Sequence, residues 1–408
     1  MDAGRTRPVA RTLARRRVVV TGVGVVSCCG QGRDAFFDGL LGPAPEGVRR
    51  VEDFDPTTVL DPKEARQTDR FAQFSVAAAR MAIEDAGGIH SDPLRAGVIF
   101  GTGVGGLETL QEQIGVLIEK GPRRVSPRLV PMMMANAGAA AISMRFGLRG
   151  PCETVVTACA AGTQAIGNAF RLVADGRCDT VVTGGAEAAI ASVGDYPSVG
   201  ITAFSNMTAL STSGFSRPFD RRRDGFVIAE GGAALVLEEL GRARARGAHL
   251  YAEVLGAAST ADAYHITAPA PGGAGAIACM ELALEDAGLG PNDITHINGH
   301  GTSTPLNDLA EAEAINKVFG SPGPPVTSIK GITGHALAGA GALEAVAVIC
   351  SLERGLIPPT AGCEELDPEI HLDVVRGAPR AFAPGPVLSN SFGFGGHNGC
   401  LVLGPVTS

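Results

Sequence analysis

Cys159 carries the strongest chemical signal in the chain because of the residues on either side of it. Residues 154–157 are rich in β-branched side chains and predict a buried strand. Apolar residues then recur at helical spacing from Ile166 to Val173, and Gly176 predicts the end of that helix. The thiol is therefore expected at a tight strand-to-helix junction, where free backbone amides and the helix dipole favour a thiolate. We predict that Cys159 is a nucleophile and that the other eight cysteines are small buried hydrophobes.

Three more segments place a polar or aromatic residue between glycines, where the backbone can approach a ligand closely. A histidine taken alone is more often structural, and a lone lysine is usually a solvated charge. The three segments and the cysteine segment TACAAG at 157–162 occur in a fixed order along the chain, and together they indicate one site. The segments are NGHGTSTP at 298–305, KGITGHALAGAG at 330–341 and NSFGFGGHN at 390–398.

A long-range repeat indicates how these segments are positioned. An apolar helix ending in Glu-Asp-Ala-Gly occurs at residues 74–87 and again at 277–288, each followed by a loop, a strand and a glycine corner. Three such pairs recur in order, about half a chain apart. The pattern predicts two similar α/β halves, with two sheets and helices between and outside them. We expect residues 1–17 to be an Arg-rich disordered leader, 18–255 the first half and 256–408 the second, with the site at their junction.

The composition excludes several classes of protein. The 408 residues include 34 basic and 42 acidic ones, a net charge of −8, which argues against a nucleic-acid-binding protein. There is neither a CxxC pair nor a Cys/His cluster at zinc spacing, so we expect no metal or cofactor. Nine cysteines in a chain of this size do not form a disulfide scaffold, so we expect a reducing cytoplasm.

The first 17 residues carry six arginines and a single acid. A twin-arginine signal or a transit peptide is one interpretation. We favour a short leader ahead of the first core strand, because the apolar segment that follows is interrupted by glycine and lacks a typical cleavage site. No stretch is long and apolar enough to cross a bilayer.

The four segments resemble those of the elongating β-ketoacyl-acyl carrier protein synthases, type II subtype, of the thiolase-fold superfamily. The resemblance runs from Val18 to about Leu403. It implies a thiolase-like fold with five layers, α-β-α-β-α, and a decarboxylative condensation. In that reaction an acyl group moves from acyl carrier protein to the cysteine. Malonyl-carrier protein then loses carbon dioxide, and its carbanion attacks the thioester.

The resemblance also implies roles for individual residues. Cys159 is the nucleophile, and its amide forms the oxyanion hole with that of Phe394. His300 and His335 are neutral donors to the enolate oxygen or assist the departing carboxylate, with the division between them left open. Lys330 acts through its position and charge. The residue Glu344, inside an apolar run where a lone carboxylate is costly, is expected to pair with it.

Further residues are expected around the substrate. Thr302 and Thr304 either donate to the pantetheine arm or simply cap a turn. Val104 matches the position that limits the depth of the acyl pocket, and Phe394 matches a gate. Because carrier proteins are acidic, a basic surface is expected at the tunnel mouth. The candidates for this surface are Lys63, Arg66, Arg123 and Arg124. For each of them, an ordinary solvated surface charge is an equal alternative. A homodimer is expected, or a heterodimer with a chain-length factor if the pathway makes polyketides.

The chain departs from the family pattern at two corners. Gly299 replaces a usual alanine, which would loosen the His300 turn, and His397 replaces a common threonine. Neither removes a catalytic group. A chain-length-factor subunit, which lacks the nucleophile, is therefore disfavoured.

Two other activities compete with the condensing reaction. A dinucleotide-binding oxidoreductase is suggested by GxGxxG at residues 101–106, but a lone match is weak and no clear acid follows it. A CoA-dependent thiolase would carry a second cysteine where this chain has Phe392 and Phe394. Cys400 lies beyond that corner and reads as part of a strand. Fatty acid synthesis and polyketide synthesis are both compatible with the segments.

Overall fold

The computed structural model describes residues 15–194 and 197–407. Ten of its strands form one continuous hydrogen-bonded path in the order β4-β3-β5-β6-β1-β7-β13-β12-β8-β9, with β2 paired to β1. Their bounds are β1 (Val18–Ser27), β2 (Gly30–Gln31), β3 (Ala96–Gly101), β4 (Cys152–Val155), β5 (Thr180–Glu187), β6 (Gly231–Glu239), β7 (Ala252–Ala261), β8 (His296–Asn298), β9 (Val326–Thr327), β12 (Val387–Gly393) and β13 (His397–Gly404). A separate ribbon joins β10 (Leu356–Ile357) to β11 (Arg380–Ala381).

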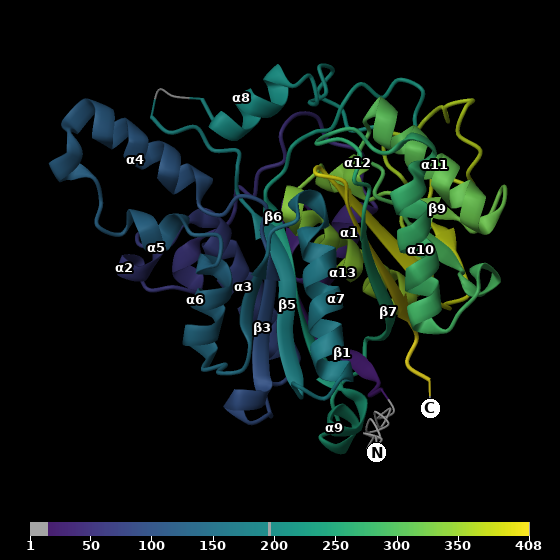
Figure 1. The fold of residues 1–408 in the computed structure, drawn as a ribbon, viewed down its shortest axis with the longest axis horizontal. Coiled ribbons are helices and arrows are strands. Elements are labelled where there is room, and N and C mark those ends of the chain that lie inside the picture. Colours follow the sequence, from purple (N-terminus) through teal and green to yellow (C-terminus); the bar gives the residue numbers. More distant parts are fainter. Residues whose placement is uncertain (1–14, 195–196, 408) are drawn as a thin grey trace, which may run out of the picture.

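The helices are spread over both halves of the chain (Figure 1). Their bounds are α1 (Arg33–Leu40), α2 (Pro62–Ala65), α3 (Arg70–Asp85), α4 (Leu107–Lys120), α5 (Leu129–Met133), α6 (Ala137–Phe146), α7 (Ala161–Ala174), α8 (Val199–Asn206), α9 (Leu240–Ala245), α10 (Ala274–Ala287), α11 (Pro305–Phe319), α12 (Lys330–Thr333) and α13 (Ala340–Arg354).

Three hydrophobic clusters account for the layers. One packs α3 and α6 against the strands of the first half, and another packs α10 and α11 against those of the second half. The third lies between the halves and contains α7 and α13, with strand residues of both. Figure 1 shows α7 and α13 in the middle, with α3 and α6 on one side and α10 and α11 on the other. The predicted thiolase-like, layered α/β fold is confirmed, with one difference: the two expected sheets are joined into one hydrogen-bonded path, because β1 pairs with β7.

The two halves meet where β1 pairs with β7. The expected boundary between residues 255 and 256 lies inside β7 and stays a prediction. Residues 1–14 of the Arg-rich leader lie outside the described residues. Its last three residues form ion pairs with acids of the folded domain: Arg15 with Asp286, Arg16 with Asp179 and Arg17 with Glu253.

Two expectations about burial are wrong. The strand before Cys159 was expected to be buried. It is β4, which lies at the edge of the sheet and, among the described residues, pairs only with β3, so its residues are exposed or half-buried. Not all of the remaining cysteines are buried either, since Cys152 on β4 is exposed and Cys28 and Cys29 are half-buried. In the described residues no helix combines the length and the apolar character that a membrane span requires.

Candidate active site between the two halves

Cys159 lies on a sharp elbow between β4 and α7. Ala158 adopts φ 49°, a left-handed conformation that is strained for a residue with a Cβ, and a 3-10 turn then leads into the helix. Small residues make the elbow possible. A Cβ on Gly162 would lie only 2.6 Å from the carbonyl oxygen of Ala338, in the second half of the chain. The predicted strand-to-helix junction is confirmed, and it is wedged between the two halves.

Burial changes the expected protonation of the nucleophile. The pKa of the Cys159 thiol is raised to about 11 by burial, against the lowering effects of the Lys330 charge and the backbone N–H of Phe394. The helix start therefore does not produce a resting thiolate, because desolvation of the charged form outweighs it. If Cys159 acts as a nucleophile, its proton must therefore leave as the new bond forms.

The turn between β12 and β13 closes over this thiol. Gly393 approaches so closely that a Cβ would lie 3.0 Å from the backbone nitrogen of Cys159. The next residue, Phe394, points its N–H at the cysteine sulfur, and its ring centroid lies 6.3 Å from that of Phe204. Gly395, at φ 83°, continues the turn. Two amides thus converge beside the sulfur, the arrangement that an oxyanion hole requires.

His300 follows β8 and is held by its backbone. The carboxylate of Glu311 accepts the N–H groups of His300 and Gly301, each at 2.7 Å. Asp308 accepts the next N–H, that of Thr302, at 2.9 Å. Both acids lie in the first turns of α11, and both are buried. Sequence reasoning missed these acids, although two carboxylates three residues apart, just after the HGTSTP segment, are a usable signal.

His335 is fixed by a short β-like ladder. Its N–H donates to the carbonyl oxygen of Val227 at 2.7 Å, and its own carbonyl oxygen accepts from Ala229 at 3.0 Å. The imidazole rings of His335 and His300 lie edge to face, 5.3 Å between centroids. The structure therefore brings together two histidines 35 positions apart in the sequence.

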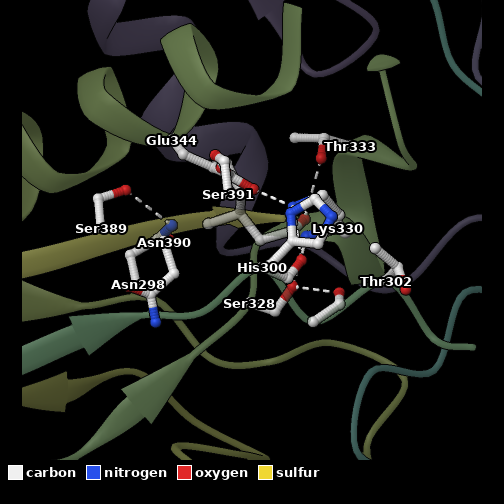
Figure 2. Close-up of polar contacts among 12 residues, drawn as sticks. Asn298, His300, Thr302, Ser328, Lys330, Thr333, Glu344, Ser389, Asn390 and Ser391 are labelled. Atoms are coloured by element: carbon white, nitrogen blue, oxygen red, sulfur yellow. Dashed lines mark hydrogen bonds and ion pairs between the residues drawn. The ribbon is translucent and has the colours of Figure 1, made fainter. Parts of the chain in front are cut away.

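Lys330 and Glu344 form the expected buried ion pair (Figure 2). The ammonium also donates to the carbonyl oxygen of His300 at 2.5 Å and lies 3.2 Å from its Nδ1. Ser391 donates to the other oxygen of Glu344 at 3.2 Å. Because an ammonium has no lone pair, Nδ1 of His300 must accept, which leaves the ring proton on Nε2.

Both histidines are neutral in this environment. Burial lowers the pKa of His300 and of His335 well below the ordinary value, and the positive charge of Lys330 lowers both further. Each ring therefore has one N–H to donate and one nitrogen to accept a proton. This agrees with the expectation of neutral imidazole donors.

One cavity of about 730 Å³ contains the cysteine, both histidines and Phe394. Thr302, Thr304 and Val104 also line it. The hydroxyls of Thr302 and Thr304 lie 2.9 Å apart, and that of Thr304 also caps α11. Thr304 thus both caps α11 and lines the cavity, and its role toward a substrate stays a prediction.

The four basic residues expected near the cavity mouth lie on two segments of the first half. Lys63 is on α2, and Arg66 ends it. Arg123 and Arg124 lie on the turn after α4. None of the four lines the cavity itself, whose lining includes residues of α8, α10 and α11 and those just before and at the start of α4. Their place at the entrance stays a prediction.

A buried carboxylate explains the GxGxxG segment. Glu187, at the end of β5, accepts the N–H of Gly103 at 2.6 Å and the hydroxyl of Thr102 at 3.2 Å. Burial raises its pKa to about 7. The amides that would cradle a phosphate in a dinucleotide site are thus occupied by the protein's own side chain. Cys400, the other competing signal, is buried within β13, away from the position of a thiolase's second cysteine.

Comparisons with known proteins agree with this geometry. The chain matches the family "Beta-ketoacyl synthase, N-terminal domain" over residues 42–243 and "Beta-ketoacyl synthase, C-terminal domain" over residues 251–364. It is 45% identical to the 3-oxoacyl-[acyl-carrier-protein] synthase 2 of Synechocystis sp., over 96% of this chain and 98% of that protein.

Solved structures are similar over nearly the whole chain. A beta-ketoacyl synthase from Burkholderia phymatum superposes with a TM-score of 0.88 at 33% identity, covering 96% of this chain and 100% of that one. A second similar structure is titled "type II PKS acyl-carrier protein in complex with its ketosynthase bound to the hexaketide". It has a TM-score of 0.87 at 30% identity, covering 96% of this chain and 100% of that one.

Proposed function

Because the chain belongs to the β-ketoacyl synthase family, we propose that it elongates acyl chains in fatty acid biosynthesis by condensing them with malonyl-acyl carrier protein. It is a condensing enzyme of the acyltransferase class. The observation that carries the proposal is the shared cavity, in which Cys159, two neutral histidines and the Phe394 amide face one space.

The first half-reaction loads the cysteine. The Cys159 sulfur attacks the thioester carbonyl of acyl-carrier protein, and its proton passes to the departing carrier thiolate, directly or through a neutral histidine. The N–H groups of Cys159 and Phe394 hold the oxyanion of the tetrahedral intermediate. Collapse of the intermediate expels the carrier thiol and leaves the acyl chain on Cys159.

The second half-reaction makes the carbon–carbon bond. Malonyl-carrier protein loses its carboxylate as carbon dioxide, and the electron pair becomes an enolate. The N–H groups of His300 and His335 stabilise the enolate oxygen. The enolate carbon then attacks the acyl thioester, and the Cys159 thiolate leaves. The product is a β-ketoacyl chain two carbons longer on the carrier protein.

Relatives favour fatty acid synthesis over polyketide synthesis. Identity reaches 45% to a 3-oxoacyl-[acyl-carrier-protein] synthase 2 and 30% to the polyketide ketosynthase structure. We therefore place the enzyme in a fatty acid pathway and in the cytoplasm, a reducing compartment that suits the nine free cysteines of the structure. Loading with a panel of saturated and polyketide acyl-carrier proteins tests the assignment, since a polyketide enzyme would prefer the latter.

The proposed protein partner is acyl carrier protein. Lys63, Arg66, Arg123 and Arg124 are exposed or half-exposed, and their charges suit an acidic carrier. Reversing these charges should raise KM for the carrier-bound substrate and leave the activity with acyl-pantetheine unchanged. An unchanged KM in all four variants would remove them from the docking surface.

We propose a homodimer that forms along the outer edge of β4, in the first half. Among the described residues, β4 has a strand partner on one side only. Large apolar side chains close to β4 in the sequence are exposed, including those of Met144 (78% exposed) and Val156 (49% exposed). Light scattering of the purified protein should give twice the monomer mass. A monomer at micromolar concentration would exclude this assembly.

Two substitutions of the nucleophile test the reaction. Cys159→Ala should abolish acyl loading, observed by intact mass, and with it elongation. Cys159→Gln should keep malonyl decarboxylation, because both histidines remain, while losing condensation. The matched control is Cys152→Ala, which removes an exposed thiol outside the cavity. Elongation by the Cys159→Ala enzyme would show that another group is the nucleophile.

A further inference from the structure

Two adjacent thiols occupy the turn of a tight hairpin. Ser27 pairs with Gly30 across β1 and β2, so Cys28 and Cys29 are the two residues of the turn between them. Their sulfur atoms lie 3.7 Å apart, and both side chains are half-buried. The distance leaves a short movement to the 2.05 Å or so of a disulfide. This dithiol takes no part in the condensing reaction.

A buried cation faces the dithiol. Arg49 is only 3% exposed, and its guanidinium donates to the carbonyl oxygens of Gly47, Pro45 and Ile332. It forms no ion pair with an acid in the described parts of the chain. The pKa of Cys28 is lowered by the hydrogen bond from Cys29 and by the charge of Arg49, although burial acts against them. Either sulfur can donate the hydrogen bond that joins them, and the charge of Arg49 favours the thiolate form of both thiols.

The dithiol lies directly behind the catalytic lysine and histidine segment. The Cys28 sulfur is 3.7 Å from the carbonyl oxygen of Thr333, the last residue of α12. Gly334 follows at φ 63° and packs so tightly on Arg49 that a Cβ would lie 2.7 Å from its Cγ. The next residue is His335. A change at the dithiol therefore acts on both ends of the turn that positions this histidine.

We propose that Cys28 and Cys29 are a redox-active pair that a hydroperoxide oxidises to a disulfide, and that the disulfide slows condensation. The Cys28 thiolate attacks the peroxide: an S–O bond forms, the O–O bond breaks, and water or an alcohol leaves. Cys29 then attacks the sulfenic sulfur; an S–S bond forms, the S–O bond breaks, and water leaves. Two thiols lose two electrons, and the peroxide gains them.

Other thiols of the chain are less suited to this reaction. Cys279 and Cys400 also lie close enough to share a hydrogen bond, but both are fully buried. The pKa of Cys159 is raised to about 11. The hairpin turn combines a lowered pKa, a neighbouring thiol and partial exposure, which the other cysteines do not.

The test begins with the modification itself, which does not depend on the proposed function. The enzyme is treated with hydrogen peroxide, free thiols are alkylated, and the peptide containing Cys28 and Cys29 is weighed. We expect loss of two hydrogens and no alkylation, reversed by dithiothreitol. Phenylarsine oxide, which bridges vicinal thiols, should bind the untreated protein and not the Cys28→Ser or Cys29→Ser variant. A hairpin peptide that stays fully alkylated after peroxide overturns the proposal.

The second readout rests on the proposed condensation. Peroxide should lower the condensation rate about tenfold to a hundredfold, the loss expected when a catalytic group is displaced by about 1 Å. The Cys28→Ser and Cys29→Ser variants should keep their condensation rate after the same peroxide treatment. Labelling of Cys159 with iodoacetamide afterwards shows that the nucleophile is still reduced. Equal inactivation of the serine variants, or a disulfide without loss of rate, overturns the coupling. A different result would refute the proposed function: the enzyme forms the disulfide on peroxide treatment, but the untreated enzyme does not condense either.

Discussion

Glu344→Gln tests the role of the buried ion pair most directly. The substitution keeps the shape of the side chain and removes the negative charge opposite Lys330, which is 1% exposed. The ammonium keeps its contacts with His300 but loses its counter-charge. Removing one member of a buried ion pair costs about 3–5 kcal/mol, because an uncompensated charge stays buried.

This penalty converts into a measurable shift of the melting temperature. Unfolding entropy of about 2.1 cal/mol/K per residue gives about 0.86 kcal/mol/K for 408 residues. Glu344→Gln should therefore lower Tm by about 3–6 °C in differential scanning calorimetry. Lys330→Met should lower it similarly, because a buried carboxylate then lacks its partner.

The double variant Lys330→Met/Glu344→Leu separates charge from catalysis. Replacing both charges with apolar side chains of similar size is often neutral, so the double variant should be more stable than either single one. It should still lack condensing activity, because Nδ1 of His300 has lost its donor. The assay is β-ketoacyl product formed from acyl- and malonyl-carrier protein, measured beside the Tm of each variant.

Three results would refute this reasoning. One is a Glu344→Gln protein whose Tm falls by less than about 1 °C, which would mean that no unpaired charge is left behind. Another is a double variant that is less stable than both single variants, which would mean that the two charges are not each other's penalty. The third is a double variant that condenses at the parent rate, which would show that Lys330 does not act on His300 through charge and position.

Three other predictions concern packing, pH and specificity. Gly162→Ala should cost about 2 kcal/mol, because its Cβ would meet a backbone oxygen at 2.6 Å. Gly299→Ala, whose Cβ would make tight contacts of 3.3 Å only with the side chains of Glu311 and Phe219, should cost less than Gly162→Ala, about 1 kcal/mol in denaturant titrations. Burial lowers the pKa of His296 to about 3, so the unfolded chain takes up a proton below pH 6.5 and the folded one does not. The parent should lose about 2 kcal/mol relative to His296→Leu between pH 8 and pH 5, and parallel pH profiles would disprove this. Val104→Phe should cut loading of long acyl chains about tenfold relative to short ones, and an unchanged chain-length ratio in intact mass spectra would remove Val104 from the pocket wall.

The local features of the site were predictable because they depend on neighbouring residues. The elbow at Cys159 needs small residues on a strand-to-helix turn, and TACAAG shows them in the sequence. The glycine corners around His300 and Phe394 are visible for the same reason. A partner for Glu344 was predictable because a carboxylate inside an apolar helix must have one, and the resemblance implied that this partner is Lys330. The other inferences use residue type and short-range order alone.

Long-range packing decided the features that sequence reasoning missed. Glu311 holds the His300 turn from a different helix, and Glu187 fills the glycine corner of β3 from the end of β5. The role of the four basic candidates stays a prediction, because none of them lines the cavity and their charges could act only at its surroundings. Contacts such as those of Glu311 and Glu187 depend on how helices and strands pack, which spacing along the chain does not record.

The sequence by itself indicated the candidate reacting groups and the duplicated α/β halves, because motifs and repeats are properties of residue order, and the resemblance that those motifs carry implied the class of reaction. The tertiary structure alone decided the electrostatic state of those groups. It buries Cys159 deeply enough to raise its pKa, keeps both histidines neutral, and sets a dithiol and a buried arginine behind the His335 turn. Burial and distance are set by the whole packed chain, so only the folded molecule shows them.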